Sequence, residues 1–188
     1  DVDVGDTLSF AATGMPSTLT MSTSGTLSGT PVNADVGAHT IIVTATDSSS
    51  AAGTITDTFV LTVTNTNDVP TVSSAIADAS TDEDAAYSLD VSGNFADVDV
   101  GDTLSYAATG MPSTLSMSTS GTISGTPVNA DVGAHTIIVT ATDSSSAAAT
   151  ASDTYILTVT NTNDAPTVSS TISDASTAED SAYSLDVS

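Results

Sequence analysis

The chain has 188 residues and combines 23 aspartates and glutamates with no lysine or arginine, so its formal net charge is −23 at neutral pH. This charge excludes nucleic acids as partners, because phosphate contacts need a cationic face, and it excludes direct binding to anionic membranes. Internal salt bridges to lysine or arginine cannot neutralise the carboxylates either. Where the acids cluster, a divalent metal ion is therefore the natural counter-ion.

The sequence repeats itself with a period of about 96 residues. The stretch that begins at Asp1 returns at Asp97, and about 79 of the 92 positions paired in this way are identical. A period of this length corresponds to a whole small domain, so we expect a tandem array of which this chain is a window. Polar stretches before Pro70 and Pro166 predict the domain boundaries. The predicted parts are the C-terminal part of one repeat (1–68), a complete repeat (69–164) and the N-terminal part of the next (165–188).

Apolar and polar residues alternate in short runs of the complete repeat, and no segment shows helical periodicity. Alternation of this kind, in a chain rich in small and β-branched residues, indicates strands. In chain order, strands are expected near 71–77, 86–92, 103–108, 114–118, 121–124, 135–142 and 153–161. So many short strands in one small domain predict an all-β fold, an antiparallel Greek-key β-sandwich of the immunoglobulin type. The chain has no cysteine, so no disulfide holds the sandwich together.

Acidic residues recur in groups along the complete repeat: in its entering linker, at Asp82-Glu83-Asp84, in the Asp97-Val-Asp-Val-Gly-Asp loop, and at Asp143. Calcium takes about six to eight oxygen ligands, and an extended Asp-x-Asp segment can turn both carboxylates to one side. An EF-hand is excluded, because the positions after Asp97 lack its glycine and its final glutamate. For Asp102 and Asp131, which stand near turn-forming residues, a purely turn-forming role is an equal alternative.

Five stretches cover nearly the whole repeat: Asp97-Val-Asp-Val-Gly-Asp-Thr-Leu-Ser-Tyr, Met111-Pro-Ser-Thr-Leu-Ser-Met, Gly121-Thr-Ile-Ser-Gly-Thr-Pro, Val139-Thr-Ala-Thr-Asp and Asn161-Thr-Asn-Asp-Ala-Pro. Together they resemble the cadherin-like domains of bacterial surface proteins, especially dystroglycan-type cadherin-like repeats and the related He_PIG-like immunoglobulin repeats. The resemblance implies a cadherin-like sandwich. The Asp-Arg-Glu motif of cadherins is absent, and Gly125-Thr-Pro occupies that region.

Cadherins bind calcium between domains, and the resemblance implies the same cofactor here. The ligands would be an acid early in a domain, the linker Asn and Asp, the Asp-x-Asp pair, and the Asp that ends a Val-x-Ala-x-Asp strand. For the complete repeat the implied ligands are Asn67, Asp68, Glu83, Asp97, Asp99 and Asp143, with Glu179 as the alternative early acid. In the neighbouring copies the corresponding residues are Asp1, Asp3, Asp47, Asn163 and Asp164.

The function expected from these features is that of a calcium-rigidified spacer in a large secreted bacterial surface adhesin, with neighbouring repeats as its partners. The alternative is an extracellular filament, in which separate chains complement one another head to tail, because residues 165–188 are the first strands that residues 1–68 lack. A carbohydrate-binding module is less favoured, since aromatic residues are few. Catalysis is not expected, because the chain has no cysteine or lysine nucleophile, no cationic group to stabilise an oxyanion and no Gly-x-Ser-x-Gly elbow.

Overall fold

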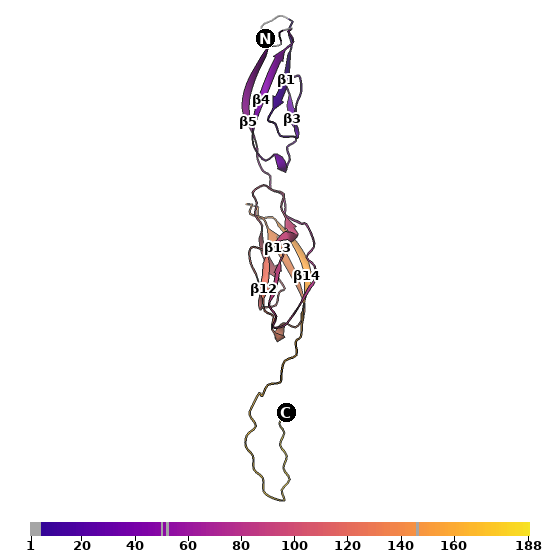
Figure 1. Cartoon of the computed structure of the whole chain (residues 1–188), viewed down its shortest axis with the longest axis vertical. Helices are drawn as coiled ribbons and strands as arrows, with labels where there is room; N and C mark the ends of the chain where they lie inside the picture. The colour runs from indigo at the N-terminus through magenta and orange to yellow at the C-terminus, as the bar shows by residue number, and fades with distance from the viewer. Residues whose placement is uncertain (1–4, 50, 52, 146) are drawn as a thin grey trace.

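The structure, a computed structural model, describes residues 5–49, 51, 53–145 and 147–188. Two β-rich units follow one another along its long axis, and an extended segment continues beyond the second unit (Figure 1). We call residues 8–63 the first unit, residues 71–160 the second unit and residues 165–188 the C-terminal segment. The predicted all-β class is confirmed, because the described residues form only strands and short 3-10 turns. In the described ranges, no helix is long and apolar enough to cross a membrane.

The first unit contains a three-stranded sheet in the order β1-β4-β5 and a two-stranded hairpin of β2 and β3. All of these pairings are antiparallel. Among the described residues, β5 pairs only with β4 and β3 only with β2, so each of these strands keeps one unpaired edge. The bounds are β1 Leu8–Thr13, β2 Leu19–Met21, β3 Leu27–Gly29, η1 Asn33–Asp35, β4 Gly37–Asp47 and β5 Thr54–Val63.

The second unit has the same strands, and here the corresponding edges are paired. Its sheets have the orders β10-β13-β14-β7, β11-β12-β8 and β6-β9. Only the β7–β14 pairing is parallel among the described strands. The bounds are β6 Thr71–Val72, β7 Ala79–Asp82, β8 Tyr87–Asp90, η2 Ser92–Asn94, β9 Phe95–Ala96, β10 Ser105–Thr109, β11 Leu115–Met117, β12 Thr122–Gly125, η3 Asn129–Asp131, β13 Gly133–Thr142 and β14 Thr150–Thr160.

The core of the second unit is built from alternate residues of its strands. Ile137 and Val139 of β13, and Tyr155 and Leu157 of β14, are at most 1% exposed. Ile123 of β12 joins the same buried cluster from the other sheet. Every second side chain of these strands thus faces one core, as expected for a sandwich. The strands predicted near 135–142 and 153–161 are confirmed.

The start of the second unit differs from the expectation. The predicted strand near 71–77 is reduced to the two residues of β6, and the chain then leaves the sheet where Ile76 N donates to Asp153 Oδ2 at 2.6 Å. β7, which the sequence pattern does not predict, follows and pairs in parallel with β14 from Leu157 to Thr160. Backbone pairing along a sheet edge holds this strand, and such a strand gives little apolar alternation in the sequence.

The C-terminal segment forms no strand, and all of its residues are exposed. Its counterparts one period earlier, residues 69–92, form β6, β7 and β8 by pairing with β9, β14 and β12. Residues 165–188 pair with no strand in the described part of the chain. Because short strands are not stable in water without partners, this sequence becomes a strand only where a partner edge is available.

Candidate metal centre

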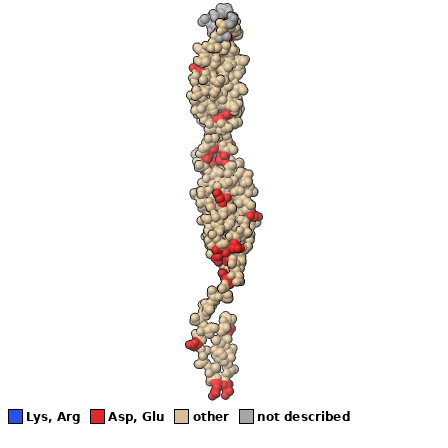
Figure 2. Space-filling view, viewed as in Figure 1, with Lys and Arg blue, Asp and Glu red and all other residues tan. Residues whose placement is uncertain are grey.

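Four aspartates lie together at the end of the second unit that faces the first unit, and we call them the entry cluster. Asp97, Asp99 and Asp102 lie in the loop between β9 and β10, and Asp143 directly follows β13. One carboxylate oxygen from each of Asp97, Asp102 and Asp143 lies within 4.8 Å of the other two. Gly101, with a φ of +99°, lets the loop turn between Asp99 and Asp102. Figure 2 shows acidic side chains at the narrow waist between the two units.

Several oxygens of the entry cluster are buried without any hydrogen-bond donor. They are Asp97 Oδ2, Asp99 Oδ1 and Asp102 Oδ2. Asp99 is only 6% exposed, and its other oxygen accepts a hydrogen bond from Asp68 N at 2.7 Å. Burial of a carboxylate without a partner costs free energy, and the sequence offers no lysine or arginine to provide one. The entry cluster therefore lacks a positive charge that a bound cation can supply.

Several hydrogen bonds hold the carboxylate of Asp143 in place. Its Oδ1 accepts hydrogen bonds from Ser145 N at 3.1 Å, Ser145 Oγ at 2.7 Å and Ala149 N at 3.1 Å. Its Oδ2 accepts one from Asn67 Nδ2 at 3.1 Å. The Ser145 hydroxyl is the largest cause of a lowered pKa, with smaller contributions from Asn67 and the two backbone amides, and together they outweigh the effect of burial. Asp143 is therefore ionised at neutral pH.

The linker between the units joins this cluster. Asn67 contacts Asp143, and the backbone of Asp68 contacts Asp99. The carboxylate of Asp68 also accepts a hydrogen bond from Asn33 Nδ2 of the first unit at 2.7 Å. Residues from the first unit, the linker and the second unit thus meet around one group of carboxylates.

A second group of acids lies at the opposite end of the second unit, and we call Glu83, Asp84 and Asp164 the exit cluster. One carboxylate oxygen of each lies within 4.8 Å of the others. Glu83 is 2% exposed; its Oε1 accepts a hydrogen bond from Thr162 N at 2.8 Å, and its Oε2 is buried without a donor. Asp84 adopts a φ of +59° and donates its N–H to Pro127 O at 2.8 Å.

The structure thus brings together only part of the implied ligand set. Asn67, Asp68, Asp97, Asp99 and Asp143 meet in or beside the entry cluster. Glu83 lies instead at the other end of the second unit, close to Asp164, because β7 runs parallel to β14 and ends beside the strand exit. Asn163 follows that exit and donates to Asp164 O at 3.3 Å. Glu83 therefore lies apart from the Asp-x-Asp pair of its own repeat.

The remaining implied ligands belong to the flanking copies. Asp47 ends β4 of the first unit, and Ser49 Oγ donates to its Oδ1 at 2.7 Å, as Ser145 does to Asp143. The Ser49 hydroxyl is also the largest cause of its lowered pKa. Asp1 and Asp3 lie outside the described residues. Glu179 is exposed in the C-terminal segment.

Two cluster residues were not among the implied ligands. Asp102 was equally explained as a turn residue, yet its carboxylate is part of the entry cluster. Asp84 stands next to Glu83, adopts a positive φ and contributes a carboxylate oxygen to the same group. Asp131, by contrast, has the turn role: its Oδ2 accepts hydrogen bonds from Thr114 Oγ1 at 2.7 Å and Val128 N at 3.0 Å.

Comparison with known proteins agrees with this architecture. A family model described as "Putative Ig domain" (He_PIG) matches residues 1–64 and 69–160. No curated protein matches the chain. Among solved structures, mouse cadherin-23 EC22-24 gives a TM-score of 0.62 at 16% identity over 82% of this chain and 53% of that one. Human mucin-like protocadherin EC1-2 gives a TM-score of 0.62 at 17% identity, over 86% of this chain and 87% of that one. Drosophila N-cadherin EC1-4 gives a TM-score of 0.56 at 20% identity, over 83% of this chain and 41% of that one.

The chain spans about half the length of the cadherin-23 structure and less than half of the N-cadherin structure. Likeness at this level of identity concerns the fold, and it confirms the cadherin-like sandwich. The family model covers most of the chain in two consecutive matches. The chain therefore belongs to the He_PIG family of immunoglobulin-like domains.

Proposed function

We propose that this chain is a spacer segment of a large extracellular surface protein, in which calcium bound at the junctions between repeats stiffens the array. The observation that carries this proposal is the set of buried carboxylate oxygens without donors at both ends of the second unit. They belong to Asp97, Asp99 and Asp102 in the entry cluster and to Glu83 in the exit cluster. The chain has no lysine or arginine to balance these charges, and a cation from solution can do so.

The donor set fits calcium. Carboxylate, amide and backbone oxygens are the ligands that calcium prefers, and the entry cluster with Asn67 and Asp68 offers all three kinds. Zinc and copper favour nitrogen and sulfur, but the chain has no cysteine. Its two histidines, His39 and His135, each contact the backbone oxygen of a turn aspartate at 2.6 Å and lie outside both clusters. When bound, calcium would supply the positive charge that these oxygens lack.

The two clusters are two halves of one kind of junction. Asp164 of the exit cluster is the counterpart of Asp68, which contacts Asp99 of the entry cluster. The linker aspartate therefore takes part in an exit cluster through its carboxylate and in an entry cluster through its backbone. In a tandem array, the exit cluster of one repeat would then meet the entry cluster of the next at a shared linker.

Such a site couples metal binding to stability and stiffness. A ligand that binds only the folded state stabilises it by RT ln(1 + [L]/Kd), which is about 2.7 kcal/mol at a hundredfold excess over Kd. Extracellular calcium modules work with dissociation constants of about 0.1–1 mM. With calcium bound the linker is fixed on both repeats, and without it the crowded carboxylates repel one another.

The wider role follows from this arrangement. We propose that the array is secreted to a bacterial cell surface, where it extends an adhesin away from the cell, with neighbouring repeats as its partners. No catalytic role is assigned, because the entry and exit clusters lie at the two ends of a β-sandwich and the sequence has no cysteine, lysine or arginine. Glycan binding is not proposed, because the sequence has four tyrosines, three phenylalanines and no tryptophan to form an aromatic platform.

Small-angle scattering and thermal melting of the chain, in calcium and in a chelator with magnesium as a comparison ion, test the proposal. We expect calcium to raise the melting temperature and to turn a broad distribution of shapes into a rod. Equal stability and equal stiffness in calcium and in chelator would contradict it.

A further inference from the structure

The turn between β7 and β8 carries the chain from one sheet of the second unit to the other. β7 pairs with β14 in one sheet, and β8 pairs with β12 in the other. Residues 83–86 connect the two strands, and Glu83 and Asp84 are the first two of them. The turn lies at the exit end of the unit, where Figure 2 shows acidic side chains gathered close to the start of the C-terminal segment.

Glu83 is held to the end of β14 through both its backbone and its side chain. Its N–H donates to Thr160 O at 2.9 Å, and its Oε1 accepts a hydrogen bond from Thr162 N at 2.8 Å. Its Oε2 is buried without a donor, in a residue that is 2% exposed. Because a buried carboxylate oxygen without a partner costs free energy, this atom marks a place where a cation would be stabilised.

Asp84 is held to the other sheet. Its N–H donates to Pro127 O at 2.8 Å, and Pro127 is fully buried shortly after the end of β12. The φ of Asp84 is +59°, in a region that few residues other than glycine adopt, although aspartate tolerates it better than most. One carboxylate oxygen of Asp84 lies within 4.8 Å of those of Glu83 and Asp164. The turn thus presents an acid to the linker while its backbone is fixed on both sheets.

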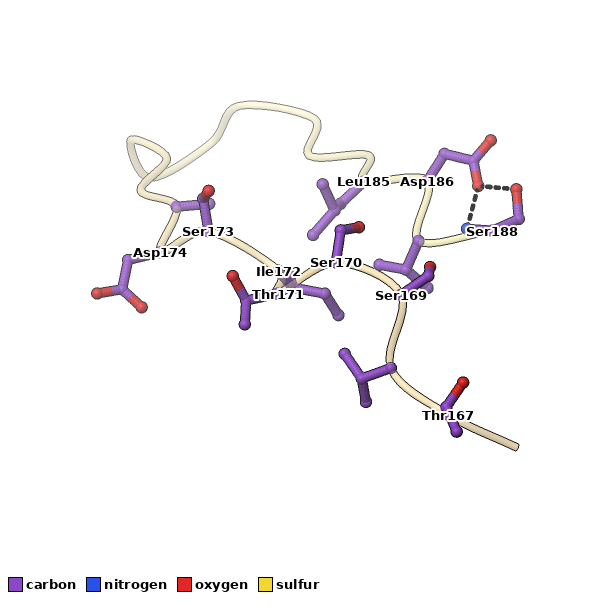
Figure 3. A pocket seen from close by; sticks show the side chains of 13 residues that line it. Thr167, Ser169, Ser170, Thr171, Ile172, Ser173, Asp174, Leu185, Asp186 and Ser188 are labelled. Carbon is purple, nitrogen blue, oxygen red and sulfur yellow. Dashed lines mark hydrogen bonds between the residues drawn. The ribbon is translucent and has the colours of Figure 1, made fainter. Parts of the chain in front are cut away.

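The same backbone conformation returns one period later. Asp180, the counterpart of Asp84, has a φ of +55° in a segment that forms no strand. It lies in the stretch that connects the two limbs of the C-terminal segment, which Figure 3 shows on either side of a hollow, with Ile172 on one limb and Leu185 on the other. Asp180 belongs to no acidic group among the described residues. The positive φ is therefore a property of the turn itself and does not depend on the exit cluster.

We propose that Asp84 is a calcium ligand of the exit cluster, and that an ion held by Glu83, Asp84 and Asp164 connects the β7–β8 turn to the outgoing linker. This inference rests on the proposed function, because it takes calcium as the ion at the junctions. It adds a second consequence of binding. Since the turn crosses between the two sheets, the ion stabilises the sandwich of the repeat itself in addition to stiffening the linker.

Asp84 should then have opposite effects on stability with and without calcium. Without the ion, the charges of the three neighbouring carboxylates repel one another, so Asp84 lowers the stability of the fold. With the ion, the same oxygens are ligands of the kind that calcium prefers, so Asp84 raises it. Asp84 and Asp164 are exposed, so an ion can reach the group from solvent. A residue that only shapes the turn would act equally in both conditions.

Melting curves of the full chain with Asp84→Gly, in calcium and in chelator, test the proposal. Glycine adopts a positive φ without strain and carries no carboxylate, so the turn is kept while the ligand is removed. In chelator the variant should melt a few degrees above the wild type, because repulsion within the group is reduced. In calcium it should melt below the wild type. Calorimetric titration should show calcium binding at least about tenfold weaker at one class of sites, because a charged ligand is lost there.

Two further variants control for the effects of glycine and of net charge. Asp84→Asn removes the charge without adding the backbone freedom of glycine, and it should shift the melting temperature in the same directions as Asp84→Gly. Asp180→Gly is the matched control, since it makes the same change at the same backbone conformation outside any acidic group of the described chain. Asp180→Gly should leave both the melting temperature and calcium binding unchanged.

The outcomes separate this inference from the proposed function on which it rests. If calcium raises the melting temperatures of the wild type and of Asp84→Gly by equal amounts, Asp84 holds no ion, while calcium binding by the other carboxylates stands. If calcium changes neither melting temperature, the proposed function fails together with the inference. If Asp180→Gly weakens calcium binding as much as Asp84→Gly does, only net charge matters and the assignment of Asp84 is overturned.

Discussion

Asn67 and Asp143 are 76 residues apart in the sequence, and their side chains meet where Asn67 Nδ2 donates to Asp143 Oδ2 at 3.1 Å. The first residue belongs to the linker and the second directly follows β13 of the second unit. The linker thus contacts the entry cluster through Asn67, and through the backbone of Asp68 as well. An ion at this place would act on a preorganised junction, which lowers the ordering cost of binding.

The first prediction concerns Asp99, whose Oδ1 is buried without a donor. In Asp99→Asn the carboxamide oxygen can still accept from Asp68 N, while the new amide N–H₂ faces the oxygens of the entry cluster. We expect calcium affinity to fall at least about tenfold, because one formal charge leaves the site. In chelator the melting temperature should rise by a few degrees, since repulsion between carboxylates is reduced.

Calorimetric titration and melting curves measure both effects. Asp78→Asn is the matched control: Asp78 is exposed, lies outside both clusters and accepts from Ile156 N through Oδ1, which an amide oxygen can replace. This control should leave calcium affinity unchanged. Equal losses of affinity in Asp99→Asn and Asp78→Asn would show that only overall charge matters.

The second prediction compares two glutamates that occupy the same position of the repeat. Glu83 is 2% exposed beside Asp84 and Asp164, whereas Glu179 is exposed and belongs to no cluster in the described chain. In chelator, Glu83→Gln should raise the melting temperature by several degrees, because it removes a buried charge that has no counter-ion. Glu179→Gln should leave the monomer's melting temperature unchanged.

Differential scanning calorimetry at low protein concentration measures these differences in melting temperature. In calcium the wild type should have the higher melting temperature, because Glu83→Gln should lose part of the stabilisation that calcium gives the wild type. A melting temperature of Glu83→Gln below that of the wild type in chelator would mean that Glu83 is structural and that its charge is tolerated without a cation.

Much of the fold could be predicted from the sequence, because the core strands bury alternate residues. Ile137, Val139, Tyr155 and Leu157 carry that alternation, and their strands were predicted close to their observed bounds. β7 escaped prediction because its place depends on backbone pairing with β14, a contact between residues about 78 positions apart. Local patterns do not contain such a pairing.

The candidate site was predictable to the extent that it is local. The spacing of Asp97 and Asp99 predicts two converging carboxylates; Asp97 shares a group of close oxygens with Asp102 and Asp143, and Asp99 donates its N–H to Asp97 Oδ1 at 2.9 Å. The place of Glu83 was not predictable, because the parallel course of β7 takes it to the opposite end of the unit. Asp84 needed a backbone φ of +59° to join the exit cluster, and the sequence does not indicate that conformation for an aspartate.

The third prediction concerns acid stability. The pKa of Asp131 is lowered from its usual 3.8, chiefly by the hydrogen bond from Val128 N and then by the Thr114 hydroxyl. Because the folded-state pKa is the lower one, this aspartate stabilises the fold fully at neutral pH. That contribution is lost as the pH falls through the folded-state value, below 3.8. The share of the melting temperature that Asp131 contributes in chelator should therefore shrink as the pH is lowered through this range.

Asp131→Asn isolates this contribution. Both hydrogen bonds reach the same oxygen, Oδ2, so an amide oxygen can keep them while the ionisable group is removed. The wild type should be more stable than the variant at neutral pH, and the two melting temperatures should converge at low pH. A difference that stays constant across the pH range would assign the effect to packing. Asp131→Ala, which loses both bonds, should be less stable than either at neutral pH.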